Sequence, residues 1–401
     1  MAIEFKRHDY QTRDSCILVK NARISLEGCE FLETEDVNGH HRGVVLKLPE
    51  EKVDRMKEIE GEDESIEEYE HYEYDPITGT NLNNPGELRI NIETQDLFTH
   101  PSESYLIIEG RLTKTDGTAY ANDDNVTLTN NALMYLFSNI KYQLSGQEIE
   151  SLFHPGQASA AAAAGNAGFS VRQSYITKSP DPKGTFSFRV PLKHIFGFCE
   201  DYDKIVYGMK QTLTLVRKTD NDAIFRNANV DDGKITFEKV SWFMPHVLPA
   251  DAEKFQLYKT LDSNELLPVM YRIRQCDYIS IPQSTSFTWR LSVKSAPERP
   301  RYIIVGFQTD KDGDQEQNPS IFDNVNVRNI FVMLNSARYP AVDYNLSFPK
   351  QQFSRANGDV AAFRSKFYNM DELVSNPNIT PPITRHFSHC LCSTSASRVS
   401  D

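Results

Sequence analysis

Four residues near the end of the sequence have side chains that can ligate a metal ion. They are His386, His389, Cys390 and Cys392, in the stretch "RHFSHCLC". Structural zinc takes four ligands in a tetrahedron, usually as two pairs separated by a loop. Here all four fall within seven residues, so they cannot easily surround one ion. We therefore assign no metal site to this cluster.

Two pairs of aspartates, each with one residue between them, form a second candidate. Asp201 and Asp203 lie close in sequence to His194, and Asp220 and Asp222 follow. A metal or acid–base site would require these groups to converge in one pocket. Acidic residues in turns at strand ends account for them more simply, and this is the interpretation we favour.

The stretch "TDKDGDQEQNPS" has the acidic texture of a calcium-binding loop. An EF-hand loop needs glycine at its sixth position and glutamate at its twelfth. Counted from Asp310, Gly313 is fourth and Ile321 is twelfth, so the pattern fails and an acidic turn between strands is favoured. The sequence also lacks the G-x-S-x-G, G-x-x-x-x-G-K-[ST] and G-x-G-x-x-G motifs. We predict no catalytic, cofactor-binding or metal-binding residues, and hence no enzyme.

Three further residues are interpreted as structural. Trp242 and Trp289 stand inside alternating segments, which favours packing over stacking on a sugar. His246, in "MPHVLP", is expected to be a hydrogen-bonded structural histidine. Because a fold does not determine a function, a ligand-binding, lectin-like β-sandwich remains an alternative, and a metal-dependent hydrolase a third.

The charge of the 401-residue chain is concentrated in one segment. Residues 50–75 contain thirteen acidic and three basic residues, a net charge of −10 out of −13 for the whole chain. We favour a solvated or disordered linker here over an acidic ligand site. The remainder is nearly neutral and has no broad basic surface, so direct binding to nucleic acid is not expected.

The location of the protein follows from segments that the sequence lacks. No apolar run reaches the length of a membrane span, and the opening "MAIEFKRHDYQTRDS" has no apolar core of a secretory signal. We therefore expect an intracellular protein, in the cytoplasm or nucleus. The six cysteines are expected to be reduced there.

Alternation of apolar and polar residues, which is typical of half-buried strands, dominates the sequence from Glu87 to Pro245. A short helix is predicted after Asp251, and strand patterns resume from Leu267, as in "LPVMYRIRQCDYISIP" and "TSFTWRLSV". Two helical candidates interrupt the strands, "PLKHIFGFCEDYDKIVYG" and "QQFSRANGDVAAFRSKFYNMDELV". Asp-Gly turns are predicted at Asp116, Asp232 and Asp312. The pattern predicts an all-β protein with two tandem antiparallel jelly-roll sandwiches and short helices in loops.

Several long phrases resemble one protein family. They are "PKGTFSFRVPLKHIFGFCEDYDKIVYGMKQTLTLVRKTDNDAIF", "KVSWFMPHVLPADAEK", "IPQSTSFTWRLSVKSAPERPRYIIVGFQT" and "FVMLNSARYPAVDYNLSFPKQQFSR". The chain is similar, from about Asn84 to Ile379, to the double jelly-roll major capsid proteins of Polinton/Maverick elements and adintovirus-like viruses. This resemblance implies two upright jelly rolls and a homotrimer of pseudo-hexagonal outline that tiles an icosahedral shell. Implied partners are other copies of the chain and penton or minor capsid proteins, and the implied location is the virion.

The resemblance divides the chain into five parts, and its ends depart from the family. We expect an N-terminal extension with an acidic linker (1–83), a first jelly roll (84–250), a helical linker (251–266), a second jelly roll (267–379) and an atypical tail (380–401). The tail "TPPITRHFSHCLCSTSASRVSD" lacks strand alternation. Our hypothesis is that it is out-of-frame sequence in an endogenous, C-terminally truncated copy, which leaves the second jelly roll short of strands.

Overall fold

The computed structural model describes most of the chain apart from the two termini and several internal segments. The described residues are 2–5, 16–19, 22–25, 30–35, 41–47, 66–77, 82–93, 97–155, 182–262, 269–290, 302–334, 336–356, 358–359, 362–363 and 389–392. The alanine-rich run at 158–168 and the side chains of the C-terminal histidines and cysteines lie outside the described part.

The chain divides into two compact units. The smaller unit comprises Met1–Tyr69 and Val247–Leu266, and the larger comprises Glu70–His246 and Leu267–Asp401. In the smaller unit, β1 (Ala2–Phe5), β5 (His41–Lys47) and β4 (Glu30–Glu35) form an antiparallel sheet, and β2 (Cys16–Val19) pairs with β3 (Ala22–Ser25). The short helix predicted after Asp251 is present as α6 (Asp251–Asp262).

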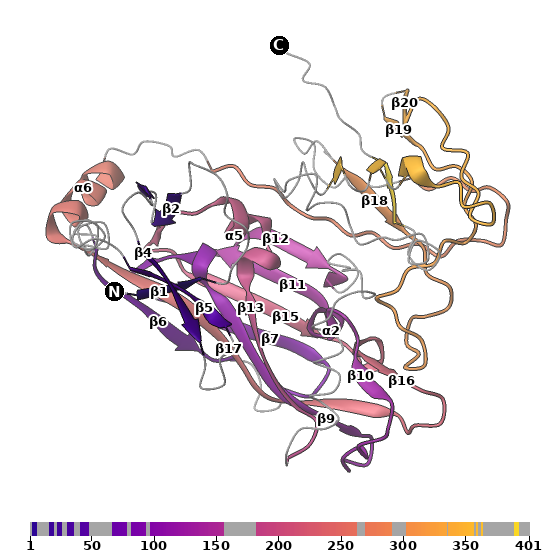
Figure 1. The fold of residues 1–401 in the computed structure, drawn as a ribbon, viewed down its shortest axis with the longest axis horizontal. Helices are drawn as coiled ribbons and strands as arrows, with labels where there is room; N and C mark the ends of the chain where they lie inside the picture. The colour runs from indigo at the N-terminus through magenta and orange to yellow at the C-terminus, as the bar shows by residue number, and fades with distance from the viewer. Residues whose placement is uncertain are drawn as a thin grey trace. The chain divides into compact units, whose positions relative to one another are not determined.

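The first jelly roll contains two antiparallel sheets and a short two-stranded ribbon. Figure 1 shows these strands, and the order within each sheet follows from its hydrogen bonds. The four-stranded sheet has the order β12 (Gln147–Phe153), β11 (Phe137–Leu144), β15 (Gln211–Arg217) and β7 (Gly86–Ile92). The six-stranded sheet has the order β13 (Thr185–Pro191), β9 (Tyr105–Lys114), β17 (Gly233–Pro249), β8 (Phe98–Thr99) and β14 (Val206–Tyr207), with β6 (Ile66–Tyr74) also paired to β17. The ribbon joins β10 (Val126–Leu128) to β16 (Ile224–Arg226).

Short helices occupy the connections of this jelly roll. They are η1 (Pro101–Glu103), α2 (Ala132–Tyr135), η2 (Leu192–His194), α5 (Gly197–Asp201) and η3 (Asn221–Ala223). η2, α5 and β14 fall on the first of the two helical candidates. Of the second candidate, described residues 354–356, 358–359 and 362–363 are helical.

Burial of the side chains along the strands follows the predicted period-two pattern. In β7, Leu88, Ile90 and Ile92 are buried, while the residues between them are exposed or half-buried. Trp242 of β17 and Tyr142 of β11 are fully buried, with their rings edge to face at 6.1 Å between centroids. Trp242 is therefore a core residue of the first sandwich. The described part is built from antiparallel strands with only short helices, which confirms the predicted all-β class.

Two of the three predicted Asp-Gly turns have the expected glycine conformation. Gly117 and Gly313 have φ of 91° and 80°. The prediction is wrong at Asp232, because Gly233 is not in a left-handed conformation and begins β17 instead. A Cβ atom at Gly233 would lie 2.8 Å from the Tyr120 hydroxyl, so close packing accounts for the glycine there.

The acidic segment is partly ordered, contrary to the favoured interpretation of a disordered linker. Residues Ile66–Tyr74 form β6, which pairs with β17. The solvated part of that interpretation holds for this strand, because seven of its nine residues are exposed. Glu73 pairs with Lys239 of β17 at 2.5 Å, and the hydrogen bond from Lys239 lowers the pKa of Glu73.

The described residues after Leu267 form fewer strands than the sequence predicts for them. β18 (Ile303–Gly306) pairs with β21 (His389–Cys392), and β19 (Val332–Leu334) pairs with β20 (Ala337–Tyr339). Tyr344, Leu346, Phe348 and Phe353 form a small buried cluster. The strand predictions at 267–282 and 285–293 are wrong for the described residues 269–290, which form no strand.

Candidate functional site

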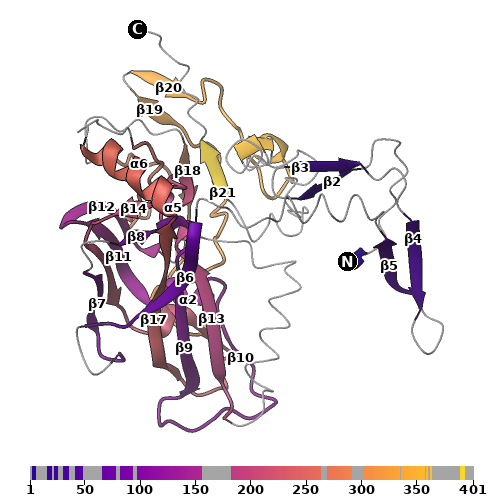
Figure 2. The ribbon, with the colours of Figure 1, turned by 90° about the vertical axis from the view of Figure 1, so that its left-hand side faces the viewer.

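Around Gly233–Phe237, one edge of the long strand β17 is paired by side chains, whereas β8 and β6 pair with other parts of β17. The opposite edge pairs with β9, where Gly233 lies across from Lys114 and Phe237 from Gly110; Figure 2 shows β9, β13 and β17 running alongside one another. The backbone groups of Gly233, Ile235 and Phe237 all bond to side chains from other parts of the chain. A stretch of strand without a neighbouring strand on one side needs such partners, because buried backbone N–H and C=O groups without hydrogen bonds are costly.

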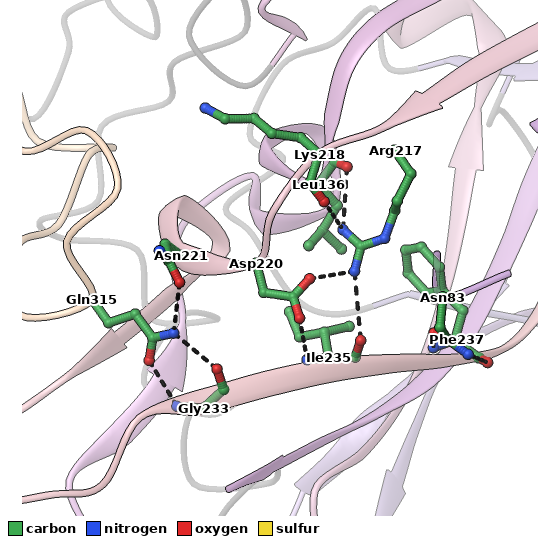
Figure 3. Close-up of polar contacts among 10 residues, drawn as sticks. All are labelled: Asn83, Leu136, Arg217, Lys218, Asp220, Asn221, Gly233, Ile235, Phe237 and Gln315. Atoms are coloured by element: carbon green, nitrogen blue, oxygen red, sulfur yellow. Dashed lines mark hydrogen bonds and ion pairs between the residues drawn. The ribbon is translucent and has the colours of Figure 1, made fainter. Parts of the chain in front are cut away.

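Gln315 pairs with the first of these residues, although it lies more than eighty positions away in sequence. Its Oε1 accepts the Gly233 N–H at 2.8 Å, and its Nε2 donates to the Gly233 carbonyl at 2.8 Å. The same Nε2 donates to Oδ1 of Asn221 at 3.1 Å. The primary amide therefore replaces a neighbouring peptide group, as Figure 3 shows.

Asp220 and Arg217 pair with the second residue. Asp220 Oδ2 accepts the Ile235 N–H at 2.8 Å, and Arg217 Nη2 donates to the Ile235 carbonyl at 3.5 Å. The two side chains also form an ion pair through Arg217 Nη2 and Asp220 Oδ1. Arg217 Nη1 donates to the carbonyls of Leu136 and Lys218.

Asn83 pairs with the third residue by the same geometry as Gln315. Its Oδ1 accepts the Phe237 N–H at 2.6 Å, and its Nδ2 donates to the Phe237 carbonyl at 3.1 Å. We call this arrangement the side-chain ladder. Its members are Asn83, Arg217, Asp220 and Gln315 along β17, all visible in Figure 3.

Arg217 is the most deeply buried charge of the side-chain ladder. Its side chain is 2% exposed, and its guanidinium lies 4.6 Å from the centre of the Phe237 ring. Burial lowers the pKa of Arg217, while the charge of Asp220 opposes that shift. A guanidinium stays protonated in proteins, so its charge has to be compensated at this site by Asp220.

Residues 308–323, which follow β18, are attached to the first jelly roll by more than Gln315. Asp222, which is 1% exposed, forms an ion pair with Lys218 and accepts the Gly313 N–H at 2.7 Å. Burial acts to lower the pKa of Lys218, but the hydrogen bond and charge of Asp222 raise it overall. Tyr135 donates to the Pro319 carbonyl at 3.0 Å. Sequence-distant segments are thus joined into one block.

A second attachment lies at α5. We call residues 271–274 the strap. Arg272 donates from its backbone N–H to Asp201 at 2.7 Å and pairs with the same carboxylate through its guanidinium. A Cβ atom at Gly197 would lie 1.6 Å from the Arg272 carbonyl oxygen, so only glycine permits this approach. Arg274 pairs with Glu200 at 3.1 Å.

The structure does not bring the two D-x-D pairs together. Asp201 binds Arg272, whereas Asp203 binds Ser102 and His100, at 2.8 and 2.9 Å. Asp220 and Asp222 pair with Arg217 and Lys218 as described above. The His194 side chain is exposed, and its backbone carbonyl accepts from Arg274. These aspartates hold segments of the fold together.

The other candidate residues also have structural surroundings. The His246 ring forms a hydrogen bond with the Tyr74 hydroxyl at 2.7 Å and stacks on the Tyr72 ring. Burial lowers the pKa of His246. Trp289 is half-buried. Within the described side chains, no group of three or more His, Cys, Asp or Glu residues is placed to hold a metal ion. Cys199 and Cys276 are free thiols.

The C-terminal cluster is described only in its backbone. His389, Cys390 and Cys392 belong to β21, which pairs with β18, and His386 lies outside the described residues. In the part of the chain that the structure describes, no helix has the length and apolar character needed to cross a membrane.

Sequence reasoning missed the side-chain ladder. Asn83 and Gln315 lie in loops, and their partners are 154 and 82 positions away. Hydrogen bonds between residues so far apart in the sequence leave no recognisable pattern in the residues around either partner.

Substitution of Asp220 tests the buried charge pair. Asp220→Ala leaves the buried Arg217 guanidinium without its counter-charge and the Ile235 N–H without its acceptor. We expect the free energy of unfolding to fall by about 3–5 kcal/mol, measured by urea denaturation with Trp242 fluorescence as the signal. The control is Asp231→Ala, which removes a pair to Lys114 from a side chain that is 71% exposed and should cost less than about 1 kcal/mol. Equal losses in the two variants would contradict this account.

Substitution of Gln315 tests the attachment of residues 308–323. Gln315→Ala removes both hydrogen bonds to Gly233, and we expect a loss of about 1–3 kcal/mol with faster proteolytic cleavage within 308–323. The matched control is Gln317→Ala, because Gln317 is an exposed glutamine of the same loop. If both variants resist the protease as well as the parent protein does, Gln315 does not hold the loop.

Several solved structures are similar to part of this chain. Among solved structures, the Faustovirus major capsid protein matches with 8% identity over 48% of this chain and 56% of its own, at a TM-score of 0.32. The crystal structure of PBCV-1 VP54 fitted into a reconstruction of the virophage Sputnik matches with 13% identity over 47% and 44%, also at 0.32. The cryo-EM structure of the Sputnik virophage matches with 6% identity over 47% and 49%, at 0.30. The chain spans about half the length of the solved structures that it matches. A search of curated proteins finds no match.

A protein-family model gives the assignment. The model of the double jelly roll-like domain matches residues 126–392, which is more than half of the chain. The match includes β21, within the segment that the sequence analysis treats as an atypical tail. The predicted double jelly-roll fold is confirmed, and the chain belongs to the double jelly roll-like domain family.

Proposed function

We propose that this protein is a structural, non-enzymatic major capsid protein that assembles with copies of itself into a viral shell. The observation that carries the proposal is the family match over residues 126–392. A shell subunit has to transmit contacts across its whole width, which requires its parts to act as one block. The side-chain ladder and the strap supply such connections, because they fasten the chain after Leu267 to the first jelly roll.

The proposed assembly is a homotrimer of pseudo-hexagonal outline, packed in a capsid lattice. Closed symmetric contacts are the usual result when rigid sandwiches present the same surface on every copy. Penton or minor capsid proteins are the further partners that this role implies, and the virion is its location. We further propose that the protein belongs to the Polinton/Maverick and adintovirus-like group of capsid proteins. The support is the resemblance of the sequence stretches quoted above to that group.

Assembly can be measured directly on the full chain. We expect size-exclusion chromatography with light scattering to give the mass of a trimer, and negative-stain microscopy to show pseudo-hexagonal particles or shells. Gln315→Ala should lower the trimer fraction, and Gln317→Ala should leave it unchanged. A monomer that persists over the whole accessible concentration range would count against the proposal.

We also propose, as a separate hypothesis, that the chain is an endogenous copy in which residues near 380–401 are out-of-frame sequence. The support is the composition of residues 380–401, which differs from the sequence before it. The family match through residue 392 and the pairing of β21 with β18 weigh against a departure that begins as early as residue 380. Translation of the genomic DNA downstream in the other two frames is expected to show further strand patterns, and their absence would remove this hypothesis without touching the capsid role.

A further inference from the structure

Glu150 of β12 is a carboxylate buried inside the protein where the strap meets α5. It is 4% exposed and lies opposite Tyr142 of β11. Its Oε2 accepts the Phe198 N–H at 3.1 Å. Its Oε1 is also buried and has no hydrogen-bond partner among the described residues. A buried carboxylate oxygen without a donor is costly when charged, and much less so when the group carries a proton.

The strap contacts the residues on either side of this carboxylate, Ile149 in β12 and Phe198 in α5. Tyr271 donates its hydroxyl hydrogen bond to the carbonyl of Ile149, the residue before Glu150, at 2.9 Å, and its ring meets Phe198 edge to face. The Phe198 N–H is the hydrogen-bond donor to Glu150, and the backbone N–H groups of Gly197 and Arg274 act with it to lower the pKa of this carboxyl group. Glu150 therefore lies where α5 and the strap meet, and lifting of the strap would expose its carboxyl group to water.

The charged and titratable neighbours of Glu150 come from each element packed against it. They are Tyr142 from β11, Cys199, Glu200 and Asp201 from α5, and Tyr271, Arg272 and Arg274 from the strap. Arg272 and Arg274 are already paired with Asp201 and Glu200. Burial raises the pKa of Glu150 to about 7, and the three N–H groups and the charge of Arg274 only partly oppose this shift. Burial also raises the pKa of the Cys199 thiol, which keeps that neighbour uncharged.

We propose that Glu150 is a proton-controlled latch that holds the strap against the first jelly roll when protonated and releases it when ionised. The inference does not depend on the capsid role, since it concerns two segments of one chain. If the chain does assemble, the latch would determine how tightly the strap is attached to the first jelly roll of each subunit at a given pH.

The direction of the pH dependence follows from the two states of the latch. With the strap closed, the pKa of Glu150 is about 7; with the strap lifted, the carboxyl group meets water and returns towards its ordinary value of 4.5. The closed state therefore binds the proton more tightly and is favoured at low pH. The opening equilibrium should rise as the pH passes from 4.5 to 7 and then level off, by roughly tenfold to a hundredfold between about pH 5 and about pH 8.

Amide hydrogen exchange of the full chain measures this equilibrium. Exchange of residues 270–275 and of Phe198, corrected for the intrinsic pH dependence of exchange, should show the predicted rise in opening in the parent protein. Glu150→Gln keeps an acceptor for the Phe198 N–H but cannot ionise, so its strap should stay protected at every pH. The matched control is Glu148→Gln, an exposed glutamate of the same strand, which should behave like the parent.

Three outcomes would overturn the latch. They are strap protection in the parent protein that does not change between about pH 5 and pH 8, a pH response that survives in Glu150→Gln, and a response that Glu148→Gln also abolishes. The first needs no variant, so the proposal remains testable if Glu150→Gln does not fold. Failure of the latch would leave the trimer measurement unaffected, and a monomeric protein could still show the latch.

Discussion

The backbone of a strand edge has to find hydrogen-bond partners, and this requirement organises the part of the molecule around β17. Gly233, Ile235 and Phe237 present N–H and C=O groups away from β9, and each pair of groups is met by one or two side chains from other segments. An uncovered edge would be open to pairing with any other strand. The side-chain ladder closes it and, through the same bonds, attaches loops that are distant in sequence.

This solution explains why the polar residues of the first jelly roll are placed as they are. Asp220 and Asp222 look like ordinary turn residues in the sequence, yet both are held in ion pairs and both bind backbone N–H groups. Buried charges are tolerated when paired and hydrogen-bonded, and they restrict the arrangement of the chain more than apolar contacts do. These aspartates stabilise the fold, which is consistent with the proposed role of the protein as a subunit of a viral shell.

The alternation of apolar residues was sufficient to predict the longer strands between Glu87 and Pro245, because a half-buried strand must alternate. The short strands β8, β10, β14 and β16 were not predicted. The same alternation at 269–290 did not produce strands. Alternation of apolar and polar residues shows that a segment is suited to a half-buried strand. A strand also needs a neighbouring strand to pair with, and the sequence of the segment does not specify that neighbour. Gly233 shows the same limit: the Asp-Gly pair predicted a turn, but the fold uses this glycine for close packing. The spacing of residues in the sequence likewise does not predict that Gln315 forms hydrogen bonds with β17.

The distance in sequence between β17 and Gln315 has a consequence for synthesis on the ribosome. The strands of the first sandwich are complete once the nascent chain has passed Pro249, but the residue that covers the Gly233 end of β17 is made more than sixty positions later. During that interval one end of the strand has free backbone groups, in a crowded polysome where sister chains expose the same edge. The order of translation thus creates a short period in which chaperones, or fast elongation, would protect the chain against joining its neighbours before it is finished.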